Sequence, residues 1–290
     1  MGTALTNLLL QKGYHVSHVG RNPSNGKVKC YRWSIDESYL DPQALTGVDA
    51  IIHLAGAGVA EKRWTPKRKK EIRDSRTLST KLIYDTLKSQ PNQVKVVVCA
   101  TAVGYYGITT SNDWCDETCA AGNDFLATVC SDWEAEANKI ETLNKRLVKI
   151  RIGVVLSNKG GALTQMALPV KWCVGAALGS GKQWVSWIHM NDLCTIFLQA
   201  LANDTMSGVY NGVAPNPVTN NELNKAIAKV LHRPLFLPAV PVWALRIMLG
   251  KMSQIVVTGA RVTSDRIKSA GVDFQYTDVN AAVKDLLGRE

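Results

Sequence analysis

An arginine placed after a strand-like run is the first residue of the chain that could do recognisable chemistry. Residues 14–19 alternate like a half-buried strand, and the run ends in Gly20 and Arg21. Open parallel sheets bind ligands beyond the carboxyl ends of their strands, which would put Arg21 at a ligand edge. A guanidinium there suits the 2′-phosphate of NADP, whereas NAD sites use a carboxylate. Because the first acidic residue is Asp36, the sequence favours NADP; an ordinary surface arginine is the alternative.

A turn of small residues follows a second strand-like run. Residues 50–55 read AIIHLA, which is typical of a strand buried on both faces, and GAGVA comes directly after them. Small residues let a backbone approach a ligand closely. This turn therefore predicts a second ligand-facing loop at the same edge of the sheet.

A strongly basic segment comes next, at residues 61–76. It carries eight basic and three acidic side chains, so +5 of the net charge of +10 lies there. The segment predicts the solvated face of a helix that begins near Pro66, with Thr65 as its cap. No interleaved aromatic residues accompany the charge, so nucleic-acid binding is disfavoured, and a basic scaffold for polyanions stays a minor alternative.

These residues need a framework of alternating strands and helices to position them. Strand-like and helix-like runs take turns up to about residue 155, which predicts a parallel sheet with crossover helices. Glycines and prolines become frequent beyond Leu156. We therefore predict a nucleotide-binding domain at 1–156 and a smaller substrate-side lobe at 157–290, with some segments returning to the sheet. The runs that carry this prediction are strands at 14–19, 28–33, 50–55, 94–100, 147–152 and 183–187, and helices at 66–89, at 124–143 and from Asn191.

Composition sets further limits on the class of protein. The chain has 290 residues, of which 46% are hydrophobic and 20% charged, as in globular proteins. No apolar stretch approaches the roughly 20 residues of a membrane span, and no secretory signal opens the chain. The seven cysteines form no CxxC pair and no spacing suggests a metal site. We expect reduced thiols and an intracellular location, cytoplasmic or mitochondrial, with no membrane partner and an undetermined oligomeric state.

Motifs along nearly the whole chain resemble one family. IIHLAGAGVAEKRWTPKRKKEIRDSR, CATAVGYYG, FLATVCSDWEAEA, RIGVVLSNKGGAL, VSWIHMNDL, VYNGVAPNPVTNNEL, PVWALRIMLG and GARVTSDRIKSAGVDFQY occur in the family's order. The chain is thereby similar to the NAD(P)-dependent epimerase-like subfamily of extended short-chain dehydrogenase/reductases. The resemblance implies a Rossmann-type, doubly wound parallel sheet with a small C-terminal lobe, and a family-specific region at about 234–288.

The resemblance also implies a set of NADP contacts. They fall on Gly2, Gly20, Arg21, Leu54, Ala55, Glu71, Arg76 and Val155. Physical chemistry agrees in part, because Arg76 offers a fork for phosphate and Glu71 could meet a hydroxyl or orient an arginine. A surface ion pair for the charged residues and core packing for the others are the alternatives.

The sequence identifies residues for proton transfer less clearly than residues for cofactor binding. Short-chain reductases pair a tyrosine with a lysine four residues later on the helix FLATVCSDWEAEA, but this helix contains neither. Thr101 keeps a hydroxyl at the expected strand end, and Tyr105 could supply a phenol, or could be structural. By resemblance the chain is an NADP-dependent oxidoreductase or epimerase-like enzyme acting on an unknown small molecule. The alternative is a non-catalytic NADP-binding or sensor protein, or a truncated inactive form.

Four other side chains have mainly structural interpretations. Cys130 lacks a basic partner and is expected to be inert, and His189 to open a helix that Asn191 caps. Asp124 and Glu117 are expected to bind substrate or to cap the following helix.

The beginning of the sequence differs from the family pattern. Relatives begin with a short strand and a loop of the form GGTGFIG, whose last glycine aligns with Gly2. The strand and the two earlier glycines, which let a backbone approach the pyrophosphate, have no counterpart here. We expect an incomplete form of a family member, with a real product of reduced cofactor affinity as the alternative.

Overall fold

Four parallel strands form the centre of the computed structural model, which describes residues 1–26, 28–109 and 111–288. Their order across the sheet is β12-β8-β6-β5, and Val97 of β6 lies between Ile51 and Leu147 of its neighbours. The strands are β5 (Ala50–His53), β6 (Val96–Ala102), β8 (Arg146–Ile152) and β12 (Gly208–Gly212). The strands β5 and β6 are nearly continuous apolar runs because both faces of the sheet are covered.

A second, smaller sheet holds the strand that leads to Arg21. In it, β1 (His18–Gly20) pairs in parallel with β3 (Lys29–Ser34), and two short strands add to β3 in the antiparallel sense. The short strands are β2 (Ser24–Asn25) and β4 (Tyr39–Leu40). Within the described residues no strand joins β1 to β5, so the doubly wound sheet is in two parts.

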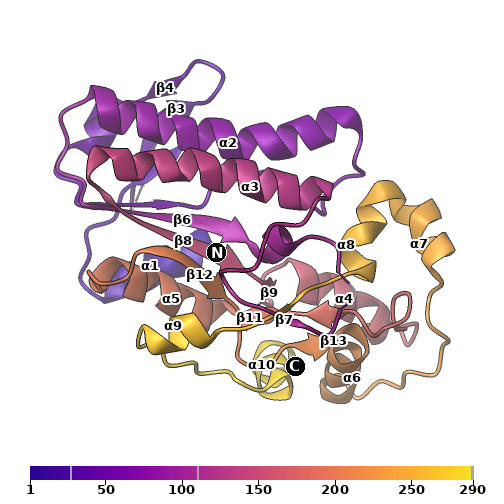
Figure 1. The fold of residues 1–290 in the computed structure, drawn as a ribbon. Coiled ribbons are helices and arrows are strands. Elements are labelled where there is room, and N and C mark those ends of the chain that lie inside the picture. Colours follow the sequence, from indigo (N-terminus) through magenta and orange to yellow (C-terminus); the bar gives the residue numbers. More distant parts are fainter. Residues whose placement is uncertain (27, 110, 289–290) are drawn as a thin grey trace.

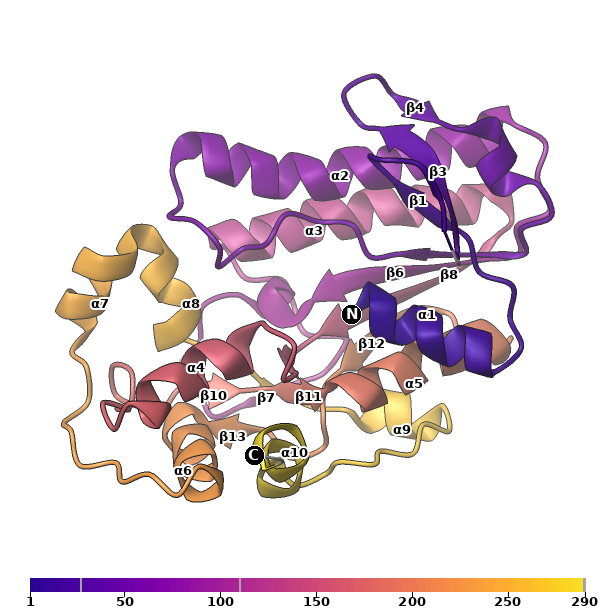
Figure 2. The same cartoon turned by 180° about the vertical axis from the view of Figure 1, so that it is seen from behind.

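Helices cover both faces of the four-stranded sheet, as Figures 1 and 2 show. On one face lie α2 (Pro66–Ser89) and α3 (Phe125–Asn138), side by side. On the opposite face lie α1 (Gly2–Gln11), α5 (Met190–Ala202) and the short α9 (Asp265–Ser269). The predicted Rossmann-type fold is therefore confirmed. No helix in the described ranges is long and apolar enough to cross a membrane.

Local capping signals explain where the long helices begin. The Thr65 side chain accepts the N–H of Arg68 at 3.1 Å, as predicted, and Asp124 caps α3 by accepting the N–H of Leu126 at 2.8 Å. The predicted cap of α5 is wrong. His189 holds that position, and its Nδ1 accepts the N–H of Asn191 at 3.2 Å. The strand before α5 ends at His189 and the helix begins at the next residue, so Asn191 lies inside the helix.

The predicted strands differ from the structure in their bounds, and two of them differ most. The run 14–19 pairs with a neighbour only from His18 onward, so Tyr14 stays exposed outside the strand. The run 183–187 is divided at Ser186, whose hydroxyl donates to the carbonyl of Ala260 at 2.8 Å. Residues before and after Ser186 then pair with different partner strands.

The remaining elements form the smaller lobe and the connections to it. The strands are β7 (Trp114–Cys115), β9 (Val154–Leu156), β10 (Trp184–Val185), β11 (Trp187–His189), β13 (Val218–Thr219) and β14 (Arg261–Val262). The α-helices are α4 (Ala162–Lys171), α6 (Asn220–Val230), α7 (Val242–Leu249), α8 (Gln254–Val257) and α10 (Val279–Leu287). The 3₁₀ helices are η1 (Pro42–Leu45), η2 (Val103–Tyr106), η3 (Lys139–Leu143) and η4 (Gly250–Ser253).

Candidate functional site

The end of β1 places Gly20 and Arg21 where the sequence predicts. A Cβ on Gly20 would meet the Sγ of Cys30 at 3.0 Å, so the close approach of β3 favours glycine at this position. Arg21 follows on the surface, and no ion pair within the described residues involves it. A guanidinium without a carboxylate partner remains available to an anionic ligand.

The loop after β5 begins with two half-buried residues, Leu54 and Ala55. Leu54 packs against the main core, so its side chain forms an apolar wall and leaves mainly its backbone for a ligand. Gly56 follows, and a Cβ there would lie 3.0 Å from the Cζ of Arg76. The loop therefore lies directly on a guanidinium that comes from α2.

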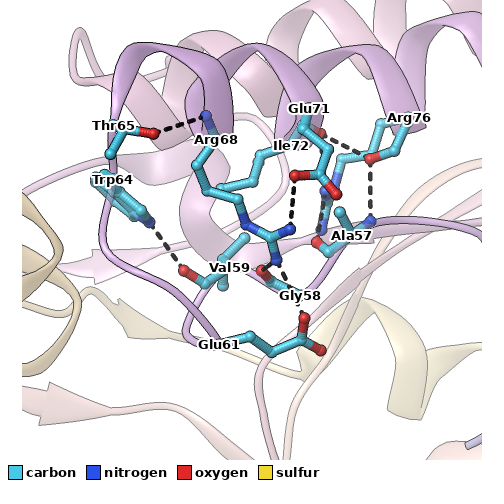
Figure 3. Close-up of polar contacts among 11 residues, drawn as sticks. Ala57, Gly58, Val59, Glu61, Trp64, Thr65, Arg68, Glu71, Ile72 and Arg76 are labelled. Atoms are coloured by element: carbon cyan, nitrogen blue, oxygen red, sulfur yellow. Dashed lines mark hydrogen bonds and ion pairs between the residues drawn. The ribbon is translucent and has the colours of Figure 1, made fainter.

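Arg76 holds this loop through backbone carbonyls, as Figure 3 shows. Its Nη1 donates to the carbonyl of Ala57 at 3.0 Å and to that of Ile72 at 2.8 Å. The guanidinium also lies 5.3 Å from the ring centroid of Trp133. No described carboxylate pairs with it, and burial lowers the pKa of Arg76 from its ordinary value. A positive charge is thus kept beside the loop with only carbonyl oxygens and a ring to stabilise it.

A second arginine of α2, Arg68, fixes the far end of the same loop (Figure 3). Only 6% of its side chain is exposed. It donates to the carbonyl of Gly58, pairs with Glu61 at 3.1 Å and pairs with Glu71 at 2.8 Å. Of the roles open to Glu71, the structure shows the orientation of an arginine. Sequence analysis missed Arg68, because it read the whole basic segment as solvated.

Thr101 lies at the end of β6, as predicted, but its hydroxyl is engaged. It is 3% exposed and donates to Oε1 of Glu134 at 3.2 Å. The same carboxylate receives Arg151 in a two-bond contact, Nε at 2.8 Å and Nη2 at 2.9 Å. These bonds are the strong, charge-assisted type. Lys149 and Arg151 alternate with apolar residues in β8 and are both buried, and that spacing could have indicated a buried polar network.

The two tyrosines after Thr101, Tyr105 and Tyr106, make different contacts. The Tyr106 hydroxyl donates to Oδ1 of Asn211 at 2.7 Å and accepts Nη1 of Arg151 at 3.2 Å. Burial raises the pKa of Tyr106 to about 12, so this phenol stays protonated near neutral pH. The half-buried ring of Tyr105 lies beneath Arg151, whose guanidinium carbon is 3.4 Å from the ring centroid. Of the two, Tyr105 remains the candidate for proton transfer.

The predicted contacts Gly2 and Val155 come close together at the opening of α1. A cavity of about 320 Å³ is lined by Val155, Ser157, Met190 and neighbouring residues including Met1. Gly2 begins α1, and a Cβ there would meet no atom within 4 Å. There is thus open space beside Gly2 at the start of α1, and the start of a helix is a place where anions bind.

Other polar residues near these elements serve the fold. Burial raises the pKa of Cys130 to about 12, so the thiol is not ionised near neutral pH. His189 lies 3.4 Å from Asp285 and helps to attach the C-terminal region to α5. Oε1 of Glu117 accepts the N–H of Asn211 at 2.7 Å. In the described part of the chain, no group of three or more His, Cys, Asp and Glu side chains could hold a metal ion.

Comparison with known proteins connects this geometry to a family. Residues 1–211 match the NAD dependent epimerase/dehydratase family, and residues 240–286 match a domain of unknown function, DUF1731. A chloroplastic homolog of epimerase family protein SDR39U1 from Arabidopsis thaliana is 42% identical, over 83% of this chain and 69% of that protein. Epimerase family protein YfhF of Bacillus subtilis is 36% identical, over 99% of this chain and 94% of its own length.

Solved structures agree with these matches. The crystal structure of human epimerase family protein SDR39U1 (isoform 2) with NADPH has a TM-score of 0.87 and 32% identity, covering 100% of this chain and 96% of that one. A UDP-glucose 4-epimerase from Thermotoga maritima shares the fold, with a TM-score of 0.77 and 16% identity over 99% of this chain and 94% of that one. With a parallel sheet covered on both faces and family matches along its length, the chain belongs to the NAD dependent epimerase/dehydratase family, as an extended short-chain dehydrogenase/reductase-like member.

Proposed function

We propose that this protein binds NADPH at the carboxyl ends of β1 and β5 and uses it in oxidoreductase or epimerase-like chemistry on a small molecule. The observation that carries the proposal is Arg21, an exposed guanidinium after β1 without a described carboxylate partner. The human relative crystallised with NADPH supports the choice of cofactor. Other structural relatives carry NAD, so the preference for the phosphorylated form depends on Arg21.

Different residues would contact different parts of the dinucleotide. Arg21 would contact the 2′-phosphate, and the loop at Leu54 and Ala55 would offer backbone groups to the central part of the dinucleotide. Gly2 at the start of α1 and Val155 in the cavity beside it would contact the remaining part. The nicotinamide supplies hydride transfer when bound, and Tyr105 is the phenol we assign to moving a proton of the substrate.

One observation favours a second candidate function, a non-catalytic NADPH-binding protein. The helix α3 carries no Tyr-x-x-x-Lys pair, and the Thr101 hydroxyl donates its hydrogen bond to Glu134. Turnover of any carbonyl compound or sugar nucleotide with NADPH, lowered by Tyr105→Phe, would exclude this candidate. The same Tyr105→Phe protein should bind NADPH normally, which separates catalysis from cofactor binding.

Calorimetric titration with NADPH and with NADH tests the cofactor proposal. We expect NADPH to bind more tightly, and Arg21→Glu to weaken NADPH by about 30- to 100-fold, since about 2 to 3 kcal/mol of charge-assisted bonding is lost. NADH affinity should change little. Lys12→Glu, at the far end of α1, is the matched charge-reversal control.

A second form of the protein makes the titration decisive. It is extended before Met1 by a short apolar strand and a glycine-rich loop, which would offer a pairing partner to β1 and β5 and more N–H groups to the pyrophosphate. We expect this form to bind NADPH more tightly. The cofactor proposal is wrong if neither form binds NADPH, or if both prefer NADH.

A further inference from the structure

Large apolar side chains are exposed together on the smaller lobe. Of the fourteen exposed large hydrophobic residues in the described part of the chain, eight lie in two stretches, 168–174 and 236–248. They are Leu168, Trp172, Val174, Phe236, Leu237, Trp243, Ile247 and Met248, which we call the lobe patch. The five most exposed of the fourteen, at 64–75%, all belong to it. Single exposed apolar residues are ordinary, whereas a cluster marks an interaction surface.

Backbone contacts bring the connections next to the two stretches side by side. The N–H of Val240 donates to the carbonyl of Ala177 at 2.8 Å, and the N–H of Gly179 donates to the carbonyl of Val240 at 2.8 Å. At the end of α4, a Cβ on Gly175 would lie 2.9 Å from the side chain of Leu235. The connection before α7 therefore runs alongside the connection after α4.

The helix α7 presents one apolar face to the outside. Trp243, Ile247 and Met248 have the spacing of a single helical face, and Leu245 turns to the buried side. Figures 1 and 2 show α7 at the edge of the molecule. Its C-terminal end is fixed by Arg63, whose Nη2 donates to the carbonyls of Ile247 and Met248 at 2.7 and 2.6 Å. Arg63 thus holds the end of this exposed apolar face in place.

The two segments that carry the patch have charged residues of a single sign. Residues 160–191 and 223–264 contain no aspartate or glutamate and eight lysines or arginines. Arg233, Arg246 and Lys251 are exposed in the segments that carry the patch or adjoin it. A surface that is both apolar and positive matches one that offers hydrocarbon beneath a layer of negative charge.

We propose that the lobe patch binds the surface of an anionic phospholipid bilayer. Its Trp and aliphatic side chains enter the interface, and Arg233, Arg246 and Lys251 contact the phosphate headgroups. A second copy fits less well, because two faces without acidic residues would repel each other. Nucleic acid would satisfy the charge but not the aliphatic side chains. Such a contact lies on the bilayer surface and does not cross the membrane. It replaces our expectation of no membrane partner, which was based on the lack of a membrane-spanning segment.

Vesicle co-sedimentation tests the proposal without reference to NADPH. The protein should sediment with vesicles of phosphatidylcholine mixed with phosphatidylglycerol, and much less with phosphatidylcholine alone or at high salt. The double variant Trp243→Ala/Ile247→Ala should bind about tenfold more weakly or worse, as should Arg246→Gln/Lys251→Gln. Matched controls outside the patch, Tyr14→Ala/Leu78→Ala and Lys12→Gln/Lys284→Gln, should sediment like the unmodified protein.

Tryptophan fluorescence gives a second readout that does not depend on loss of binding. Brominated lipids should quench the emission of the bound protein, and Trp172→Phe/Trp243→Phe should remove most of that quenching while sedimentation persists. The proposal is overturned if anionic vesicles do not bind the protein, or if patch and control variants bind alike. It is also overturned if the patch variants instead dissociate a dimer, or release an acidic protein partner, while vesicle binding is unchanged.

Discussion

Two arginines beside the candidate site, the buried Arg151 and the half-buried Arg76, have opposite kinds of partners. Arg151 meets the carboxylate of Glu134 in two bonds and also reaches Tyr106. Arg76 meets only carbonyl oxygens and the face of Trp133. One cation is neutralised in place, whereas the other keeps its charge beside the loop that follows β5.

The difference indicates which side of the site is structural and which can receive a ligand. Around Arg151 the charges cancel and the Thr101 hydroxyl is engaged, so this network joins β6, β8 and α3. Around Arg76 and Arg21 the positive charge lacks carboxylate partners within the described residues, as a site for an anionic cofactor requires. The predictions below test this division, starting with the largest effect.

Removing Glu134 should break the structural side. Glu134→Ala leaves Arg151 buried with no carboxylate, and such losses cost about 3 to 5 kcal/mol of the free energy of unfolding. Urea unfolding followed by circular dichroism measures this change. Asp132→Ala, which breaks the exposed pair with Arg73, is the control and should cost less than about 1 kcal/mol. Equal effects of the two substitutions would contradict a structural role for the network.

Acidification should lower the free energy of unfolding through protonation of His53. The ring centroids of His53 and Trp133 are 6.1 Å apart, so His53 lies close to Arg76 and its loop. Burial, with the charge of Arg76, lowers the pKa of His53 from 6.5 to about 4. Between these two pKa values, His53 takes up a proton more readily in the unfolded chain than in the folded one. The contribution of neutral His53 to the free energy of unfolding is therefore complete above about pH 6.5 and is lost as the pH falls toward 4. Unfolding at a series of pH values should show a loss of about 3 kcal/mol. His53→Asn should reduce the dependence of the free energy of unfolding on pH. If the variant shows the same pH dependence, His53 does not have this role.

Arg68→Lys should loosen the loop while leaving the network of Arg151 intact. A lysine cannot reach Gly58, Glu61 and Glu71 together, and we expect a loss of about 1 to 2 kcal/mol of stability. Hydrogen exchange should rise in residues 57–62 and stay unchanged in β6 and β8. Faster exchange in those strands as well would mean that the two regions are not separate.

A surface pair on the same helix should have the smallest effect. Lys70 pairs with Asp74 one turn along α2, on the exposed side. Lys70→Gln should change the free energy of unfolding by about 0.5 kcal/mol or less, and this should disappear at high salt. A larger, salt-independent loss would show that the basic segment contributes more than its solvated face suggests.

Local signals were sufficient to predict much of the fold. The helix at 66–89 has the predicted bounds, because Thr65 and Pro66 determine its start through their own chemistry. The apolar run 94–100 also predicts β6, which spans Val96–Ala102 and so places Thr101 near its end. The strand at 14–19 was predicted too long, because pairing with β3 limits it, and no local pattern reveals a partner.

The partners of the site residues depend on the packing of distant segments. Glu134 comes from α3 and Arg151 from β8, and only their packing brings both to Thr101. Arg68 likewise acquires its role when the loop after β5 folds back over α2. Sequence could therefore locate candidate residues at strand ends, but could not say which of them are already occupied by other side chains.

A crystal structure of the protein with NADPH tests the division between the two sides most directly. We expect the 2′-phosphate within about 4 Å of the Arg21 guanidinium, with the bonds from Thr101 and Arg151 to Glu134 unchanged. Adenosine bound away from β1, or a phosphate that replaces Glu134 beside Arg151, would contradict the account.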